Sequence, residues 1–332
     1  MSVSFKIYGA FRLRRAPLLI ILCIEICSSI QLYDILLKEA FFVQSRKGEL
    51  MLKYTEFEFR TNDGAELFAR EWQPEDIQLR GVIILLHGLG EHSGRYANMA
   101  LRFTQAGYIL STFDQRGHGN SPGRRGHTPS YEILLADIDC FRRQTLKRFS
   151  DLPAFLYGHS MGGNLVLNYV IRRLPKFSGV IVTGPWLKLT VQLPAFIRAF
   201  VRFLSKLWPT FSLSIGLELN ALSHDPSVVK AYELDPLVHK KISVRLFTAM
   251  DQAGRWAMKN AVQFNLPLLL MHGGGDRITS PEASVRFAGC VQKDCTLKIW
   301  QDLYHELHNE LEKEEIIAFI INWLELQVSS GD

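Results

Sequence analysis

The stretch LYGHSMGGNLVLNYV, residues 156–170, carries the strongest local signal in this sequence. It sets Ser160 after an apolar run typical of a buried strand and before a run with helical spacing. The pentapeptide GHSMG (158–162) matches G-x-S-x-G, in which the serine sits on a sharp strand-to-helix turn and the flanking glycines prevent side-chain collisions. We therefore predict that Ser160 is a nucleophile. An ordinary glycine-rich turn is the structural alternative.

Apolar runs like the one before Ser160 recur along the chain, and helical patterns separate several of them. The runs cover 81–88, 108–114, 154–159, 179–184, 266–273 and 296–300, and helical spacing covers 96–107, 131–149, 161–173, 281–291 and 307–326. This alternation predicts a parallel sheet with helices on both faces. Two alternating runs, 53–60 and 66–72, flank an Asn-Asp-Gly turn and predict an additional hairpin. Together, the runs predict a mostly parallel, eight-stranded sheet.

Residues 186–264 interrupt this rhythm, because no sheet strand is recognisable there. An insertion of about eighty residues is too long for a loop, and it predicts a separate helical cap or lid. The core of the fold is then expected to comprise residues 51–185 and 265–328.

The first fifty residues differ from the rest of the chain. Three arginines precede a short apolar run, 16–30, that contains a glutamate, is too short to span a bilayer and lacks a small-x-small cleavage site. Three interpretations of residues 1–50 stay open: a signal-like or membrane-associating extension, a dispensable helix, and an extension upstream of a true start at Met51. Because a strand pattern begins directly after Met51, we expect the domain to be complete without this segment.

A nucleophilic serine needs a base to remove its proton and a carboxylate to orient that base. In this strand–turn–helix architecture the chain order is serine, acid, histidine, with the last two on loops after later strands. Asp276 follows the run 266–273, and His305 follows the run 296–300. We therefore predict a catalytic triad of Ser160, Asp276 and His305.

Each of the last two assignments has a rival. Asp302 is nearer to His305 in sequence, but its place before the histidine makes it the less suitable orienting acid. His308 is an alternative base, and it lies one helical turn after His305, where a capping or packing role is expected.

The stretch LLHGLGEHSGRY (85–96) contains a His-Gly pair after a strand, in the position of an oxyanion loop. The backbone N–H groups of Leu89 and of Met161, the residue after the nucleophile, are the expected oxyanion donors. A dinucleotide-binding loop is the rival interpretation, but the glycines follow GxGxxxG and not GxGxxG.

Composition excludes several classes of protein. The net charge of +5 on 332 residues is modest and scattered, so no nucleic-acid partner is expected. The histidines and the five cysteines lack metal-ligand spacing, so we predict neither a metal nor another cofactor. The cysteines form no disulfide framework, which favours a cytoplasmic protein.

Six separated motifs occur in the chain in the order in which one protein family has them. They are HGLGEHSGRY, FDQRGHGNSPG, GHSMGGNL, LSHDPSVVKAYELDPLVH, HGGGDRI and YHELHNE. They resemble the monoacylglycerol lipase and lysophospholipase branch of the α/β-hydrolases (the serine-aminopeptidase-like hydrolases), from about Thr55 to Leu326. The resemblance implies the α/β-hydrolase fold, the same triad and oxyanion donors, and a structural loop in which Asp114 and Arg116 stabilise the floor of the active site.

The resemblance also implies an activity: hydrolysis of the ester of a monoacylglycerol or lysophospholipid through an acyl-enzyme on Ser160. A carboxylesterase or peptidase acting on small esters or peptides is the alternative, since fold and triad do not determine the substrate. The expected partner is a single-chain lipid, and a peripheral membrane contact through the cap is left open. Within the cap, the helical stretch 193–208 sets Phe196, Phe200 and Phe203 beside Arg198, Arg202 and Lys206. This pattern suits a lipid interface, with core packing as the alternative.

Overall fold

A computed structural model describes residues 52–214, 216 and 218–329 of the chain. The three interpretations of residues 1–50, and the predicted start at Met51, lie outside the described residues.

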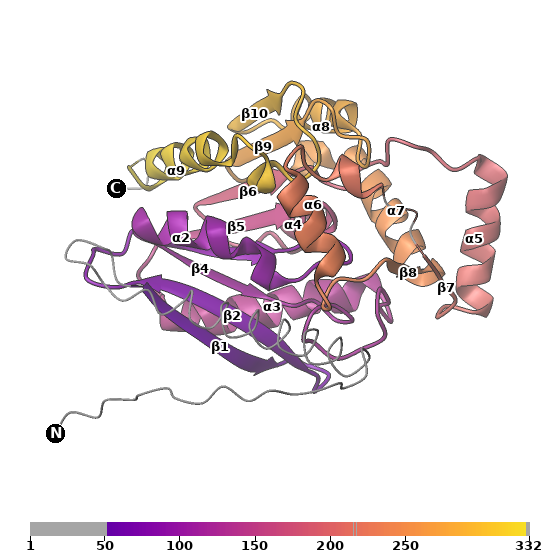
Figure 1. Cartoon of the computed structure of the whole chain (residues 1–332), viewed down its shortest axis with the longest axis horizontal. Coiled ribbons are helices and arrows are strands. Elements are labelled where there is room, and N and C mark those ends of the chain that lie inside the picture. The colour runs from indigo at the N-terminus through magenta and orange to yellow at the C-terminus, as the bar shows by residue number, and fades with distance from the viewer. Residues whose placement is uncertain (1–51, 215, 217, 330–332) are drawn as a thin grey trace, which may run out of the picture. The chain divides into compact units, whose positions relative to one another are not determined.

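The core of the described chain is an eight-stranded sheet (Figure 1). In spatial order its strands are β1 (Leu52–Arg60), β2 (Glu66–Pro74), β4 (Tyr108–Phe113), β3 (Gly81–Leu86), β5 (Ala154–His159), β6 (Gly179–Thr183), β9 (Leu268–Gly273) and β10 (Cys295–Trp300). Strand β2 pairs antiparallel with both β1 and β4, and all the other neighbours are parallel. The predicted mostly parallel sheet is confirmed.

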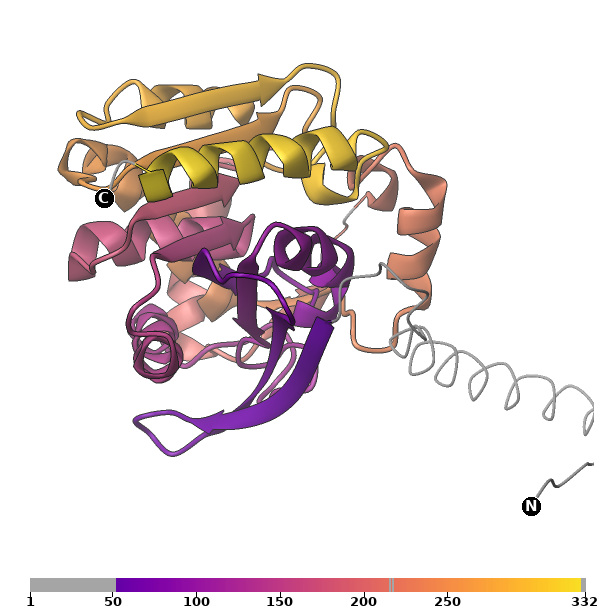
Figure 2. The ribbon, with the colours of Figure 1, turned by 90° about the vertical axis from the view of Figure 1, so that its left-hand side faces the viewer.

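Helices cover both faces of the sheet (Figures 1 and 2). Helices α2 (Ala97–Gln105) and α9 (Lys313–Ser329) pack on one face, and α3 (Tyr131–Arg148), α4 (Met161–Arg173) and α8 (Pro281–Ala288) pack on the other. Strand β3 shows why both faces are apolar: Ile83 and Leu85 join the hydrophobic cluster that contains α2 and α9, while Ile84 joins the opposite cluster. A continuous apolar run is therefore required in this strand.

The inserted segment contains more strand than its sequence pattern indicates. Its elements are α5 (Ala195–Leu207), β7 (Ser212–Ser214), η2 (Leu219–Ala221), α6 (Pro226–Leu234), β8 (Lys241–Ser243), α7 (Val244–Lys259) and η3 (Ala261–Gln263). Strands β7 and β8 form a separate antiparallel pair. Helix α7 packs on α4 and buries Leu246, Met250 and Ala257 in the same cluster as α4, so this helix belongs to the packed core.

The last helix begins later than predicted. The helical pattern was expected from residue 307, but Leu307–Asn309 form a short 3₁₀ turn, η4, and α9 begins at Lys313. The reason lies in the fully buried carboxylate of Glu310, which accepts hydrogen bonds from the backbone N–H groups of Tyr304 (2.6 Å) and His224 (2.8 Å). These bonds tie residues 304–310 into a loop against the inserted segment. The remaining 3₁₀ turn, η1 (Ser93–Tyr96), precedes α2.

Candidate active site

Ser160 occupies the turn between β5 and α4, as the pentapeptide predicts. Its backbone has φ +54° and ψ −113°, a combination that non-glycine residues rarely adopt. A Cβ atom on Gly158 would lie 2.5 Å from the carbonyl oxygen of Gly162, and one on Gly162 would lie 2.1 Å from that of Leu86. Both glycines are therefore required for the turn to close against the end of β3.

Three loops bring Ser160, His305 and Asp276 together beyond the carboxyl ends of the parallel strands. The hydroxyl of Ser160 donates to Nε2 of His305 (2.9 Å), and Nδ1–H of His305 donates to Oδ2 of Asp276 (2.7 Å). All three side chains are buried. This tautomer leaves Nε2 free to accept a proton, which is the arrangement that a general base requires.

His305 and Asp276 shift each other's pKa values in favour of their charged forms. Burial by itself would lower the pKa of His305, but the charge of Asp276 and its hydrogen bond outweigh burial and raise that pKa above its ordinary value. Burial raises the pKa of Asp276, yet the contacts with His305 and His272 hold it far below its usual range. Asp276 is therefore a carboxylate that stabilises a protonated His305.

Asp276 has further partners that the sequence reasoning missed. Its Oδ2 atom accepts from Nε2–H of His272 (3.0 Å) and from the hydroxyl of Thr279 (2.9 Å), and its Oδ1 atom accepts from the backbone N–H groups of Ile278 (2.7 Å) and Thr279 (2.9 Å). Because the carboxylate of Asp276 can only accept, Nε2 of His272 carries the proton and Nδ1 accepts from the hydroxyl of Ser284 (2.7 Å). A histidine on the strand that leads into the acid loop was the available signal.

The rivals of Asp276 and His305 have other surroundings. Asp302 is exposed, and within the described chain it makes no hydrogen bond or ion pair with His305. The buried ring of His308 stacks on Tyr96, with ring centroids 4.7 Å apart, and within the described residues its two nitrogens have no hydrogen-bond partner. Burial lowers the pKa of His308. The geometry thus favours the packing role for His308.

The loop after β3 passes directly beside the serine, since a Cβ atom on Gly88 would lie 3.2 Å from Cβ of Ser160. Nε2 of His87 accepts from the backbone N–H of Gln115 (2.9 Å), so Nδ1 carries the proton and donates to the carbonyl oxygen of Gly88 (2.8 Å). That carbonyl and the N–H of Leu89 belong to one trans peptide and point in opposite directions. His87 thereby orients the Leu89 N–H.

Met161, the other expected oxyanion donor, is the first residue of α4. The first N–H groups of a helix have no acceptor inside the helix and carry partial positive charge. The N–H of Met161 is therefore placed next to the nucleophile at a helix end that favours negative charge.

A buried ionic network, which the sequence analysis did not predict, underlies the expected oxyanion loop. The carboxylate of Glu91 accepts from the N–H of Gly88 (2.6 Å) and pairs with Arg95 (2.9 Å), and Arg95 also makes two bonds of 2.7 Å to Glu306. Burial opposes ionisation of Glu306, but Arg95 lowers its pKa to about 2. The guanidinium of Arg95 lies 4.6 Å from the ring centroid of Tyr232, which joins this network to α6.

Asp114 and Arg116, which the resemblance assigns to the floor of the active site, form hydrogen bonds with neighbouring loops and with α3. Asp114 accepts from the backbone N–H groups of Ser93 and Asn120, both at 2.8 Å, and Arg116 forms a two-pronged contact with Asp137. Neither residue lines the active-site cavity.

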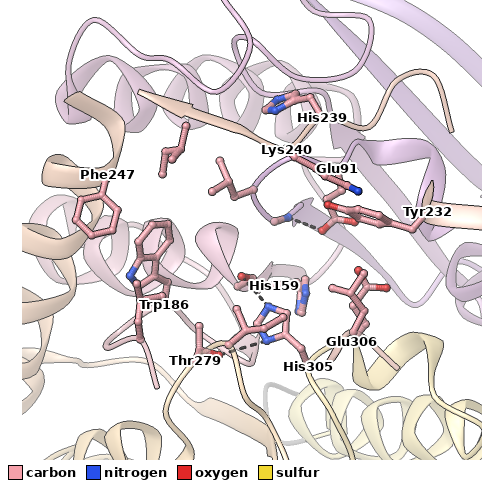
Figure 3. Close-up of a pocket in the computed structure, with 17 residues that line it drawn as sticks. Glu91, His159, Trp186, Tyr232, His239, Lys240, Phe247, Thr279, His305 and Glu306 are labelled. Carbon is pink, nitrogen blue, oxygen red and sulfur yellow. Dashed lines mark hydrogen bonds between the residues drawn. The ribbon is translucent and has the colours of Figure 1, made fainter. Parts of the chain in front are cut away.

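Ser160 and His305 open into a cavity of about 120 Å³ that Leu89 also lines. Figure 3 shows Trp186 and Phe247 on one side of this cavity, and Tyr232 with Glu91 on the other. Over residues 52–329, without 215 and 217, no group of three or more His, Cys, Asp or Glu side chains is placed to hold a metal ion.

A comparison with family models matches residues 77–312 to the serine aminopeptidase S33 hydrolases. The chain belongs to this family. It is 32% identical to the monoacylglycerol lipase of Mycolicibacterium smegmatis, over 81% of this chain and 96% of that protein. The crystal structure of a Paleococcus ferrophilus monoacylglycerol lipase superimposes with a TM-score of 0.70 at 35% identity, covering 84% of this chain and 99% of that one. These matches confirm the predicted monoacylglycerol lipase branch of the α/β-hydrolases.

A further relative is much longer than this chain. An abhydrolase domain-containing protein of Dictyostelium discoideum is 38% identical over 82% of this chain, and the match spans 29% of that protein.

In the part of the chain that the structure describes, none of the helices combines the length and the apolar character needed to cross a bilayer.

Proposed function

We propose that this S33 hydrolase cleaves the ester bond of monoacylglycerols or lysophospholipids through an acyl-enzyme on Ser160. The observation that carries the proposal is the buried hydrogen-bond chain from Ser160 through His305 to Asp276, at 2.9 Å and 2.7 Å, beside a cavity with aromatic walls. The similarity to monoacylglycerol lipases supports a single-chain lipid as the substrate. The chain is then a carboxylic ester hydrolase.

Acylation begins when Nε2 of His305 takes the hydroxyl proton of Ser160 and the serine oxygen attacks the ester carbonyl. The carbonyl oxygen becomes an oxyanion, which the N–H groups of Leu89 and Met161 stabilise. Collapse of this intermediate breaks the bond to the glycerol oxygen, and His305 donates its proton to that leaving group. The fatty acyl chain stays on Ser160.

Deacylation repeats these steps with water as the nucleophile. His305 removes a proton from water, the hydroxide attacks the acyl carbonyl, and the proton returns to the oxygen of Ser160. The products are a fatty acid and glycerol or a glycerophosphate derivative. Neither half-reaction requires a metal ion or another cofactor.

The predicted cap comprised residues 186–264; in this proposal it ends at β8, because α7 packs in the core. Its helix α5 supports a peripheral membrane contact: Phe196, Phe200 and Phe203 are 74%, 62% and 57% exposed. The cations Arg202 and Lys206 lie on the same helix. An amphipathic helix of this kind buries its aromatic residues at the boundary between lipid head groups and chains.

The free thiols of Cys140, Cys290 and Cys295 support a cytoplasmic setting.

A substrate panel tests the proposed activity. The full chain is assayed against a long-chain monoacylglycerol, a lysophospholipid, a short p-nitrophenyl ester and a peptide with N-terminal proline. We expect the highest kcat/KM for the single-chain lipids. Cleavage of the peptide without hydrolysis of either lipid would support the peptidase alternative and overturn the proposal.

A further inference from the structure

A second cavity adjoins the candidate active site. It occupies about 650 Å³ and is bordered by the loop that contains Arg124 and Arg125, by β7, and by the segment from α6 to β8. Tyr232, His239 and Lys240 line both cavities, so the two share a wall. The proposed mechanism makes no use of the second cavity.

Among the charged residues that line this second cavity, cations outnumber carboxylates. The cations are Arg124, Arg125, Lys240 and Lys241, against the carboxylates Glu233 and Asp235. Asp235 is already engaged, because it accepts from Nε2 of His92 (2.8 Å) and from a backbone N–H (2.9 Å). Among the residues that the structure describes, none of the four cations forms an ion pair. Their charge is therefore available to an anion.

Arg125 gives a second, independent sign of a missing partner. Its Nη1 atom is buried and has no hydrogen-bond partner among the described residues. Leaving a charged donor buried and unpaired is unfavourable, and guanidinium groups bind phosphate oxygens through paired N–H donors. The charge of Arg125 also reaches His239: burial is the main cause that lowers the pKa of His239 to about 4, and Arg125 adds to it.

We propose that this second cavity binds the phosphate of a lysophospholipid head group, an inference that rests on the proposed esterase function. In such a substrate the phosphate and the acyl chain lie on opposite sides of the scissile ester. Trp186 and Phe247 offer an apolar wall on one side of His305, whereas Tyr232 on the other side leads to the cationic cavity (Figure 3). Head groups with net negative charge are preferred, because choline would bring another cation toward Lys240 and Lys241.

The experiment compares substrates that share one acyl chain and differ in head group. Lysophosphatidic acid, lysophosphatidylcholine and monoacylglycerol are assayed with the wild-type chain and with Arg124→Gln/Arg125→Gln. The matched control is Arg286→Gln/Lys293→Gln, which removes two exposed cations that line neither cavity. Thermal unfolding verifies that each variant is folded. Inorganic phosphate is added as a competitor.

We expect the ratio of kcat/KM for lysophosphatidic acid to that for monoacylglycerol to fall on the order of tenfold in Arg124→Gln/Arg125→Gln and to stay constant in the control. We also expect inorganic phosphate to raise KM for lysophosphatidic acid and to leave KM for monoacylglycerol unchanged. An unchanged ratio would overturn the head-group site, as would phosphate that binds without competing, which would indicate a site for free phosphate. Failure to hydrolyse any of the three lipids would instead overturn the proposed function.

Discussion

The protonation state of His305 determines whether this residue can act as the general base. A general base must be neutral, and Asp276 raises the pKa of His305 above its ordinary value against the opposing effect of burial. We therefore predict that kcat/KM for a neutral ester falls as the pH decreases through this raised pKa. Asp276→Asn removes the charge that raises the pKa, so the acidic limb moves to lower pH while kcat drops by about 10⁴. A pH–rate profile of both proteins checks this, and an unmoved limb would contradict the assignment.

The choice between two neighbouring histidines gives a second prediction. His305→Ala should lower ester turnover on the order of 10⁴ to 10⁶, because it removes the base. His308→Ala should cost far less, because the ring of His308 packs against Tyr96 and lies edge-on to His159, with no hydrogen bond to Ser160. Steady-state kinetics on the two folded variants decide between them. Equal losses would show that the base is wrongly assigned.

The three triad residues could be predicted from the sequence, because their order along the chain is characteristic. The residues that hydrogen-bond to the triad and to its loops could not. Ser160, Asp276 and His305 each follow a recognisable strand, so their meeting at one edge of the sheet could be foreseen. The contact of Arg95 with Glu306 joins residues 211 positions apart, and no local pattern marks either partner. Such ionic networks depend on how loops pack, which propensity and periodicity do not describe.

Among the elements, helix α5 exposes the side chains of three phenylalanines, Phe196, Phe200 and Phe203. Phe200→Ser/Phe203→Ser should weaken binding to anionic vesicles and lower turnover of a long-chain substrate, yet spare a short soluble ester. Both phenylalanines are exposed, and each nearby cation contributes about 1 kcal/mol at an anionic surface. Vesicle sedimentation and paired assays measure the effect.

The matched control for α5 is Val285→Ser/Leu311→Ser, which alters two exposed apolar residues outside the inserted segment. We expect this variant to bind vesicles as the wild-type chain does. If turnover of the long and the short ester falls together in the α5 variant, the helix contributes to packing and the interface proposal fails.

The strands with a long apolar or alternating pattern were predicted correctly. All eight strands of the main sheet coincide with apolar or alternating runs. The pair β7 and β8 escaped notice, because strands of three residues carry no measurable periodicity. The delayed start of α9 follows from tertiary bonds to Glu310, which local helical spacing does not reveal.

For the whole molecule, the described hydrolase is organised as a sheet that begins with β1 at Leu52. We predict that a chain beginning at Met51 folds and hydrolyses esters, because all eight strands of the sheet lie within it. Circular dichroism, thermal unfolding and an assay with a short ester compare it with the full chain. Loss of folded, active protein on removal of residues 1–50 would favour a structural or anchoring role for that segment.

Active-site labelling shows whether Ser160 forms the covalent acyl-enzyme. The full chain is treated with a serine-reactive phosphonate, digested, and the modified residue is located by mass spectrometry. We predict a single label on Ser160, no label in Ser160→Ala, and a strongly slowed reaction in His305→Ala, whose base no longer activates the hydroxyl. A label on another serine, or ester hydrolysis retained by Ser160→Ala, would show that Ser160 is not the nucleophile.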